Sequence, residues 1–194
     1  MRHDESRTAF MFPAAAQPFA APRNVTKLSE VGALALDGAG LRDALEAHHV
    51  ESYSWTLSCC WRRRDEAENV LQLVYVKVLS GKAVFDGKSS FKTWLFAVIR
   101  KTAAQEYRME LLRRLRLSQI PKLLYREPPR EQHGVEIQLK EALGKLPARQ
   151  REVLQLVFYH DHSIVEAAKV MGVGIGSART HYERGKKQMR RRLA

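Results

Sequence analysis

The residue types with the clearest chemistry are cations at helical spacing near the C-terminus. Residues 179–194 hold seven Lys or Arg against a single Glu, at position 183. Guanidinium and ammonium groups in such a stretch bind the phosphates of nucleic acid, and Arg also reads guanine edges. The side chains that would face a duplex, from this segment and just before it, are Ser177, Arg179, Thr180, His181, Arg184 and Lys187.

Apolar and glycine spacing just before this basic segment predicts a helix-turn-helix. Ala168 belongs to the buried face of one helix, and Gly172 follows where the turn needs a positive φ. Ala178 and Tyr182 then begin the buried face of a second helix. That second helix would read DNA in the major groove. The same spacing also suits an ordinary helical hairpin whose basic face is merely solvated.

A second concentration of cations lies in residues 100–130, with nine Lys or Arg against three Glu. An aromatic cluster comes just before it, made of Phe85, Phe91, Trp94 and Phe96. Aromatic rings beside cations can hold unstacked, single-stranded bases. The alternative is that the helically spaced aromatics belong to a hydrophobic core, which their spacing favours.

Candidates for enzymatic chemistry are poor. His160 and His162 flank Asp161, but this triplet precedes the helix-capping Ser163, where polar turn residues are expected anyway. No phosphate-binding loop, nucleophile elbow or zinc-protease motif occurs, so we expect no metal, no cofactor and no enzymatic activity. The adjacent Cys59 and Cys60 are interpreted as small apolar residues on a helix, which fits a reducing cytosol.

The overall composition limits the class of protein that can carry these sites. The 194 residues carry 33 Lys and Arg against 21 Asp and Glu, a net charge of +12, while 45% are hydrophobic. The charge favours an acidic partner, with nucleic acid or an anionic membrane surface as the first candidates, and the apolar content excludes a wholly disordered chain. No apolar run approaches the ~20 residues that a membrane-spanning helix needs. We therefore expect a cytoplasmic protein that binds nucleic acid.

The predicted fold is all-α, with two small helical domains joined by a flexible linker. Residues 1–38 are rich in Ala and Pro and are expected to form a flexible tail, in preference to a signal peptide. Residues 39–116 are predicted to form the first helical domain and 117–135 the linker. Residues 136–194 form the second domain, in which Ser163 and Glu166 predict a capping box.

Three segments, taken together, resemble a known family. Residues 66–72 (EAENVLQ), 90–96 (SFKTWLF) and 146–154 (LPARQREVL) are similar, in this order, to bacterial RNA polymerase sigma factors. The resemblance covers about residues 40–194, includes the helix-turn-helix, and points to the small extracytoplasmic-function branch. It implies a monomeric initiation factor that melts the minus-ten promoter element with its first domain and reads the minus-thirty-five element with its second.

The resemblance also implies roles for individual residues and partners. The first domain would dock on the β′ clamp helices of core RNA polymerase, and the second would pack on the β flap. Such factors are commonly held by an anti-sigma partner. The implied polymerase-binding residues are Glu66, Glu68 and Gln72. Those for the melted strand are Lys88, Lys92, Trp94, Arg100, Lys101 and Arg108. Arg149 joins the residues of the second helix on the upstream duplex.

The sequence departs from the family pattern at several of these positions. Asn69 and Leu73 stand where the family commonly has acidic residues, which removes charge from the polymerase-docking face. Lys101 and Gln105 replace the usual Asn and Asp of the melting helix. Two other functions therefore stay open: a helix-turn-helix regulator that never docks on polymerase, and a sigma-like adaptor that has lost its DNA function.

Overall fold

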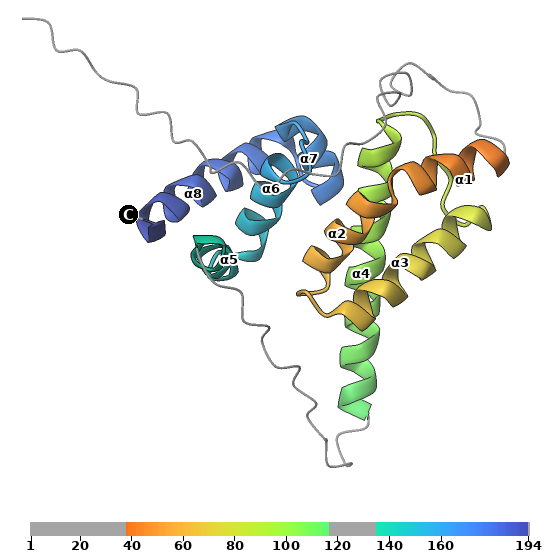
Figure 1. Cartoon of the computed structure of the whole chain (residues 1–194), viewed down its shortest axis with the longest axis horizontal. Helices are drawn as coiled ribbons and strands as arrows, with labels where there is room; N and C mark the ends of the chain where they lie inside the picture. The colour runs from red at the N-terminus through yellow and green to blue at the C-terminus, as the bar shows by residue number, and fades with distance from the viewer. Residues whose placement is uncertain (1–37, 117–134, 194) are drawn as a thin grey trace, which may run out of the picture. The chain divides into compact units, whose positions relative to one another are not determined.

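The computed structural model describes residues 38–116 and 135–193, and these ranges form helices joined by short loops, with no strand among them (Figure 1). The first group contains four helices: α1 (Gly38–Ala47), α2 (His49–Cys59), α3 (Arg64–Leu79) and α4 (Phe91–Arg116). The second group also contains four: α5 (Val135–Gly144), α6 (Ala148–Phe158), α7 (Ile164–Met171) and α8 (Ile175–Leu193). The all-α prediction is confirmed. None of these helices is both long enough and apolar enough to cross a bilayer.

In the first group, α2, α3 and α4 pack on one another around a core of large side chains. The apolar stripe of α3, from Ala67 to Val78, recurs at the helical period and is buried. Before it, a break at His48 separates α1 from α2. After α2, Trp61 and Arg62 both adopt positive φ, and this left-handed turn redirects the chain into α3.

The second group contains the predicted helix-turn-helix. The Ser163 hydroxyl accepts from the Glu166 amide and the Glu166 carboxylate accepts from the Ser163 amide, which completes the capping box of α7. Gly172 ends α7 with φ 63°, the left-handed conformation that glycine adopts most readily. Further along α8, a Cβ on Gly185 would lie 3.0 Å from Leu154 Cδ1 of α6. The absence of a side chain at 185 therefore lets α8 lie close against α6.

The two groups also pack against each other, mainly through α4 and α7. One continuous core contains Trp55, Leu95 and Phe96 from the first group together with Leu156 and Val170 from the second. Burial of this apolar surface, at roughly 25 cal/mol per Å², stabilises the contact. The sequence predicts two helical domains, and the structure adds a shared core between the two groups.

Candidate nucleic-acid interface

Helix α8 presents a cationic stripe on the side opposite its buried residues. Ala178, Gly185 and Met189 face inward, at the seven- and four-residue spacing of one helix face. Thr180, Arg184, Lys187 and Arg191 follow one another at intervals of four, three and four residues, so they line the opposite face. All four are exposed, and Arg184, Lys187 and Arg191 line a shallow surface hollow.

The other predicted α8 residues lie beside this stripe. Ser177 and Arg179 are exposed at the N-terminal turns of α8, and His181 is half-buried. The hydroxyl of Thr180 donates to the Gly176 carbonyl at 3.0 Å, which holds this side chain against its own helix. Thus the structure places all six predicted residues on α8, with three of them in or next to its first turn.

Arg149 comes from a different helix and reaches the turn between α7 and α8. Its Nη1 donates to the Met171 carbonyl at 3.3 Å and to a Glu152 carboxylate oxygen at 3.2 Å. Met171 is the last residue of α7, so this arginine satisfies an otherwise open helix-end carbonyl. The structure therefore brings Arg149 to the start of the helix-turn-helix corner.

On α4 the predicted residues divide between two faces. Trp94, Lys101 and Arg108 recur every seven residues, which is about two helical turns, so they form a stripe along one side. Lys101 and Arg108 are exposed, and Trp94 is half-buried. The Trp94 ring packs against Phe85 and Phe91, with centroids 5.4 and 5.3 Å away. This stripe therefore joins an aromatic cluster to two exposed cations. Of these, Arg108 donates from its Nε to the Ala104 carbonyl of its own helix.

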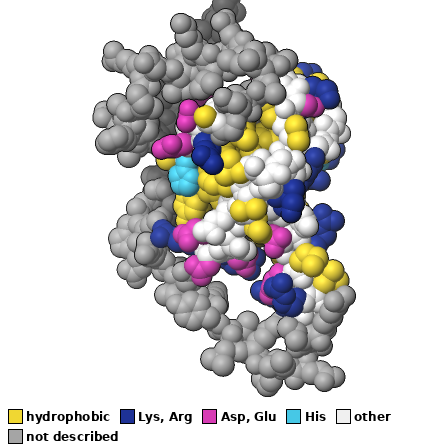
Figure 2. Space-filling view, turned by 90° about the vertical axis from the view of Figure 1, so that its right-hand side faces the viewer, with side chains coloured by type: hydrophobic (Ala, Val, Ile, Leu, Met, Phe, Trp, Pro, Cys, Tyr) yellow, Lys and Arg dark blue, Asp and Glu magenta, His cyan; other side chains and the backbone are white. Residues whose placement is uncertain are grey.

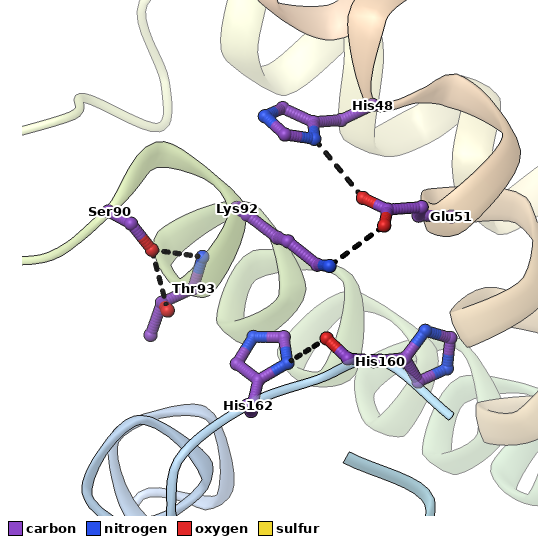
Figure 3. A network of polar contacts seen from close by, with 7 residues as sticks. All are labelled: His48, Glu51, Ser90, Lys92, Thr93, His160 and His162. Carbon is purple, nitrogen blue, oxygen red and sulfur yellow. Dashed lines mark hydrogen bonds and ion pairs between the residues drawn. The ribbon is translucent and has the colours of Figure 1, made fainter. Parts of the chain in front are cut away.

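Lys92 and Arg100 lie on another face of α4, where each meets a carboxylate. Figure 3 shows the pair that Lys92 makes with Glu51. Lys92 Nζ lies 2.8 Å from Glu51 of α2, and Arg100 pairs with Glu152 of α6. His48 and Lys92 both contact Glu51, and these contacts lower its pKa to about 2 despite partial burial. Hence Lys92 and Arg100 make structural ion pairs, whereas Lys101 makes none with the residues that the structure describes.

Lys88 lies in the loop before α4 and is almost fully exposed. Its ammonium group lies 2.8 Å from Asp86, and its backbone carbonyl accepts from Lys169 Nζ of α7 at 3.0 Å.

The four residues of the predicted aromatic cluster lie in two different places. Phe96 is fully buried and stacks on Trp55 at 5.6 Å, whereas Phe85, Phe91 and Trp94 pack together near the Lys88 loop.

The residues predicted to bind polymerase lie on α3, and two of them share its solvent face. Glu68 and Gln72 are exposed on the side opposite the buried stripe. Val76 and Leu79 continue this face and remain 59% and 51% exposed. Figure 2 views the side of the molecule on which α1 and α3 lie in Figure 1, and it shows exposed hydrophobic side chains beside acidic ones. The sequence-based prediction missed Val76 and Leu79. They could have been found as apolar residues that fall outside the buried face of α3 when the helical period is followed.

Glu66 differs from the other two predicted polymerase residues. It pairs with Arg63 at the start of α3 and lines a cleft between α3, α4 and α6. Exposed apolar side chains at the rim of this cleft are Trp61, Tyr107 and Met109. Across it, the guanidinium of Arg151 lies 4.2 Å from the centroid of the Trp61 ring, a cation–π contact between the two groups.

The two histidines of the turn before α7 are buried between the groups (Figure 3). His160 meets the rings of Trp55 and Phe96 edge-on, at 5.5 and 5.0 Å. Burial, with help from the nearby Lys92, lowers the pKa of His160 to about 4 and that of His162 in the same direction. The neutral rings therefore serve as packing, and no cluster of three or more metal-ligating residues occurs in the described ranges.

Profiles of known protein families match both helical groups of the chain. Residues 46–111 match the family profile "Sigma-70 region 2", and residues 136–189 match "Sigma-70, region 4". The chain belongs to the sigma-70 factors, in their extracytoplasmic-function branch. Region 2 thus spans α2, α3 and most of α4, and region 4 spans the helix-turn-helix of this sigma factor.

Individual relatives agree with this assignment. The extracytoplasmic-function sigma factor SigX of Bacillus subtilis is 27% identical over 157 residues, which cover 76% of this chain and 80% of SigX. The sigma factor YlaC of the same organism is 27% identical over 165 residues, covering 78% of this chain and 93% of YlaC. Among solved structures, the sigma factor RpoE in complex with the anti-sigma factor NepR from Bartonella quintana shares the fold, with a TM-score of 0.62, 22% identity and coverage of 78% and 95%.

Proposed function

We propose that this sigma factor melts the minus-ten element with α4 and reads the minus-thirty-five element with α8, while α3 docks on core RNA polymerase. The observation that carries the proposal is the pair of stripes on different helices, one aromatic and cationic and one purely polar and cationic. A single DNA-binding module would need only one of them.

The α4 stripe has the chemistry of a single-strand binding surface. Trp94 and its aromatic neighbours offer a surface for one flipped or unstacked base, worth roughly 1–3 kcal/mol. Lys101 and Arg108 lie about 10 Å apart along the helix, which suits two phosphates that are not adjacent on an extended strand. Lys92 and Arg100 have a smaller part in this surface, because each is paired with a carboxylate.

The α8 stripe suits duplex DNA. The second helix of a helix-turn-helix enters the major groove, and its N-terminal half contacts base edges. Thr180 and Arg184 lie in that half, where Arg184 can donate two hydrogen bonds to a guanine. Lys187 and Arg191 come later on the same face and suit phosphates flanking the site. Arg149 supports the corner from α6.

The α3 face supports polymerase docking through mixed contacts. Glu68 and Gln72 supply polar groups, and Val76 and Leu79 supply exposed apolar surface on the same side. Because Asn69 and Leu73 lack the acids common in the family, we expect apolar burial to carry a larger share of core binding here. At about 25 cal/mol per Å², two half-exposed aliphatic side chains add roughly 1–3 kcal/mol.

A protein partner is also proposed for this sigma factor. Two solved structures that share the fold are a complex of RpoE with the anti-sigma factor NepR and a complex of CnrH with the cytosolic domain of CnrY. By analogy, an anti-sigma partner would control this chain. The apolar rim of the cleft between α3, α4 and α6 offers a surface for such a partner.

The test combines core binding with transcription. Full-length chain is mixed with core RNA polymerase, recovered by pull-down, and assayed for run-off transcription from promoter DNA. We expect association and promoter-directed transcripts that need both elements. Substitution of Val76→Asp on α3 is expected to reduce core binding at least tenfold, whereas Val84→Asp, which is 71% exposed outside the helices, leaves it unchanged. DNA binding as a dimer without any core association would instead establish the regulator function.

A further inference from the structure

Lys77 of α3 is a cation that belongs neither to the buried stripe of that helix nor to its proposed docking face. Helices α3 and α4 pack side by side, and the half-buried Lys77 reaches from the first to the second (Figure 1). Its Nζ donates to the Thr102 hydroxyl at 3.2 Å and to the side-chain oxygen of Gln105 at 3.3 Å. Both acceptors are neutral. The lysine is therefore held in place by α4 without being neutralised by it.

The two contacts place the Lys77 ammonium group beside the α4 stripe. Gln105 follows Lys101 by four residues and precedes Arg108 by three, so it lies on the same face of α4 as both. Residues at these intervals have Cβ atoms only about 5–6 Å apart. Gln105 is exposed, whereas Thr102 is 2% exposed and anchors the lysine at the buried side. Three cations from two helices therefore gather around one exposed amide.

This grouping favours a bound anion. Neither Lys77, Lys101 nor Arg108 pairs with a carboxylate among the residues that the structure describes, so their mutual repulsion is not relieved within the protein. An ammonium group only donates, which fixes the amide oxygen of Gln105 on Lys77. The two N–H bonds of that amide are then left as further donors to an anion.

The interval between the two stripe cations has room for one more contact. Lys101 and Arg108 lie about 10 Å apart along α4, a spacing that suits phosphates which are not adjacent on the strand. Gln105 lies between them in the sequence of the helix, and it holds Lys77 there. A phosphate between those two would thus meet the Lys77 ammonium group.

We propose that Lys77 binds the backbone phosphate of the melted strand that lies between those bound by Lys101 and Arg108, and that Gln105 is its positioning residue. The inference rests on the proposed function, because it adds a cation from α3 to the strand-binding surface of α4. Gln105 stands where the family commonly has Asp, and a carboxylate there would pair with Lys77 and cancel its charge. The neutral amide instead leaves that charge to the strand.

Binding of a single strand at several salt concentrations tests the contact. The probe is a fluorescent oligothymidine titrated with the full-length chain, and a duplex of random sequence serves as the second probe. Lys77→Met removes the charge and keeps an unbranched apolar side chain, whereas Lys77→Arg keeps the charge. Lys145→Met is the control, since Lys145 is exposed just after α5, outside both stripes. Circular dichroism checks that every variant keeps its helical content.

We expect Lys77→Met to weaken oligothymidine binding about three- to tenfold. It should also reduce the slope of log affinity against log salt by roughly 0.7, the value for one phosphate contact on a single strand, which a purely structural role would not change. Lys77→Arg should keep most of the affinity, and Lys145→Met should keep both quantities. Duplex binding should stay unchanged in Lys77→Met, because α8 supplies it.

Two negative results have different meanings. If Lys101→Ala weakens oligothymidine binding and Lys77→Met leaves affinity and slope unchanged, the role of Lys77 is overturned and the proposed function stands. If neither variant changes the binding, the strand-binding surface on α4 is wrong as well, and the proposed function fails with it.

A double-mutant cycle assigns the role of Gln105. Gln105→Ala removes the acceptor without a change of charge and should weaken oligothymidine binding by roughly two- to fivefold. In the Lys77→Met chain the same substitution should have no further effect, because Gln105 acts through the lysine. Equal losses in both chains would show that Gln105 contacts the strand itself, and would contradict its positioning role.

Discussion

The indole Nε1 of Trp55 donates a hydrogen bond to the backbone carbonyl of Phe96 at 3.1 Å, and the two rings stack 4° from parallel. This contact joins α2 to α4 at the point where His160 of the second group packs against both rings. It satisfies a buried polar group while it buries two large rings, so it supports both the first group and the contact between the two groups.

Truncating this indole should therefore be severe. Trp55→Ala is expected to lower the free energy of unfolding by about 3–5 kcal/mol, because it leaves a cavity among fully buried residues. Trp61→Ala is the matched control, since that ring is 59% exposed and its cation–π contact is worth about 1 kcal/mol or less. Urea unfolding followed by circular dichroism measures both. Similar losses in the two variants would contradict the assigned core.

Arg184 is expected to read the upstream duplex. Arg184→Ala should weaken binding of the polymerase complex to minus-thirty-five DNA by roughly 1–3 kcal/mol and leave core association unchanged. Arg113→Ala removes an equally charged, exposed side chain from α4, where it pairs with Glu110, and should have little effect. Competition binding at fixed salt distinguishes them. A parallel loss of core binding would show that the reading face lies elsewhere.

Lys101 and Lys92 should behave differently despite lying on the same helix. Lys101→Ala is expected to weaken binding of melted-strand DNA and to leave stability unchanged, because Lys101 is exposed on the Trp94 stripe. Lys92→Ala should also lower stability, by about 1–2 kcal/mol, because it leaves Glu51 half-buried without its ammonium partner. Lys82→Ala, exposed in a loop, controls for charge. Oligonucleotide affinity is measured beside thermal unfolding.

The buried histidine predicts a pH dependence of stability. Desolvation, with Lys92 and His162 nearby, lowers the pKa of His160 to about 4, against the opposing influence of Glu51. The unfolded chain therefore takes up a proton between pH 6.5 and 4 that the folded chain resists. The free energy of unfolding should fall by roughly 3 kcal/mol as pH drops across this interval.

His160→Gln checks this assignment, because it removes the titrating group. Its stability should depend less steeply on pH between 6.5 and 4.5, the interval above the range in which Glu51 contributes. Glu51, with its pKa lowered to about 2, contributes stability that is present above pH 4.5 and lost as pH falls towards 2. An unchanged slope in His160→Gln would assign the effect to another group.

Two glycines of the helix-turn-helix should respond oppositely to alanine. Gly172→Ala forces a side chain into φ 63° and should cost about 1 kcal/mol or more. Gly176→Ala, in the first turn of α8 with nothing within 4 Å of the added Cβ, should stabilise the helix by up to ~1 kcal/mol. Thermal unfolding compares them, and two changes of the same sign would refute the turn geometry.

Local features of the fold could be predicted from sequence because each depends on neighbours in the chain. The stripe from Ala67 to Val78 follows the helical period, and the Ser163–Glu166 capping box and the Gly172 turn are signals a few residues long. The contact between the two groups has no such signal. Trp55, Phe96 and His160 are separated by about forty to sixty residues, and the histidines have the sequence context of an ordinary turn.

The cations of α4 show the same limit of prediction from sequence. Lys92, Arg100 and Lys101 all carry a positive charge, and the sequence-based prediction therefore grouped them together. Helix phase already turns Lys101 towards the Trp94 side. Which of the remaining cations is neutralised depends on Glu51 and Glu152, carboxylates that only the folded chain brings near.

Gly185 marks the boundary between the packed side of α8 and its solvent-facing side. Its Cα faces Leu154 so closely that an added methyl group would sit 3.0 Å from Leu154 Cδ1, yet its neighbour Arg184 points into solvent. Under the proposed function, exchange of residues 180, 184 and 187 is expected to retarget the protein to a different promoter without disturbing its interior. Position 185 is expected to set the angle and depth at which these side chains meet DNA. Retargeting by directed evolution should therefore work best with 185 held as glycine while positions 180, 184 and 187 are randomised.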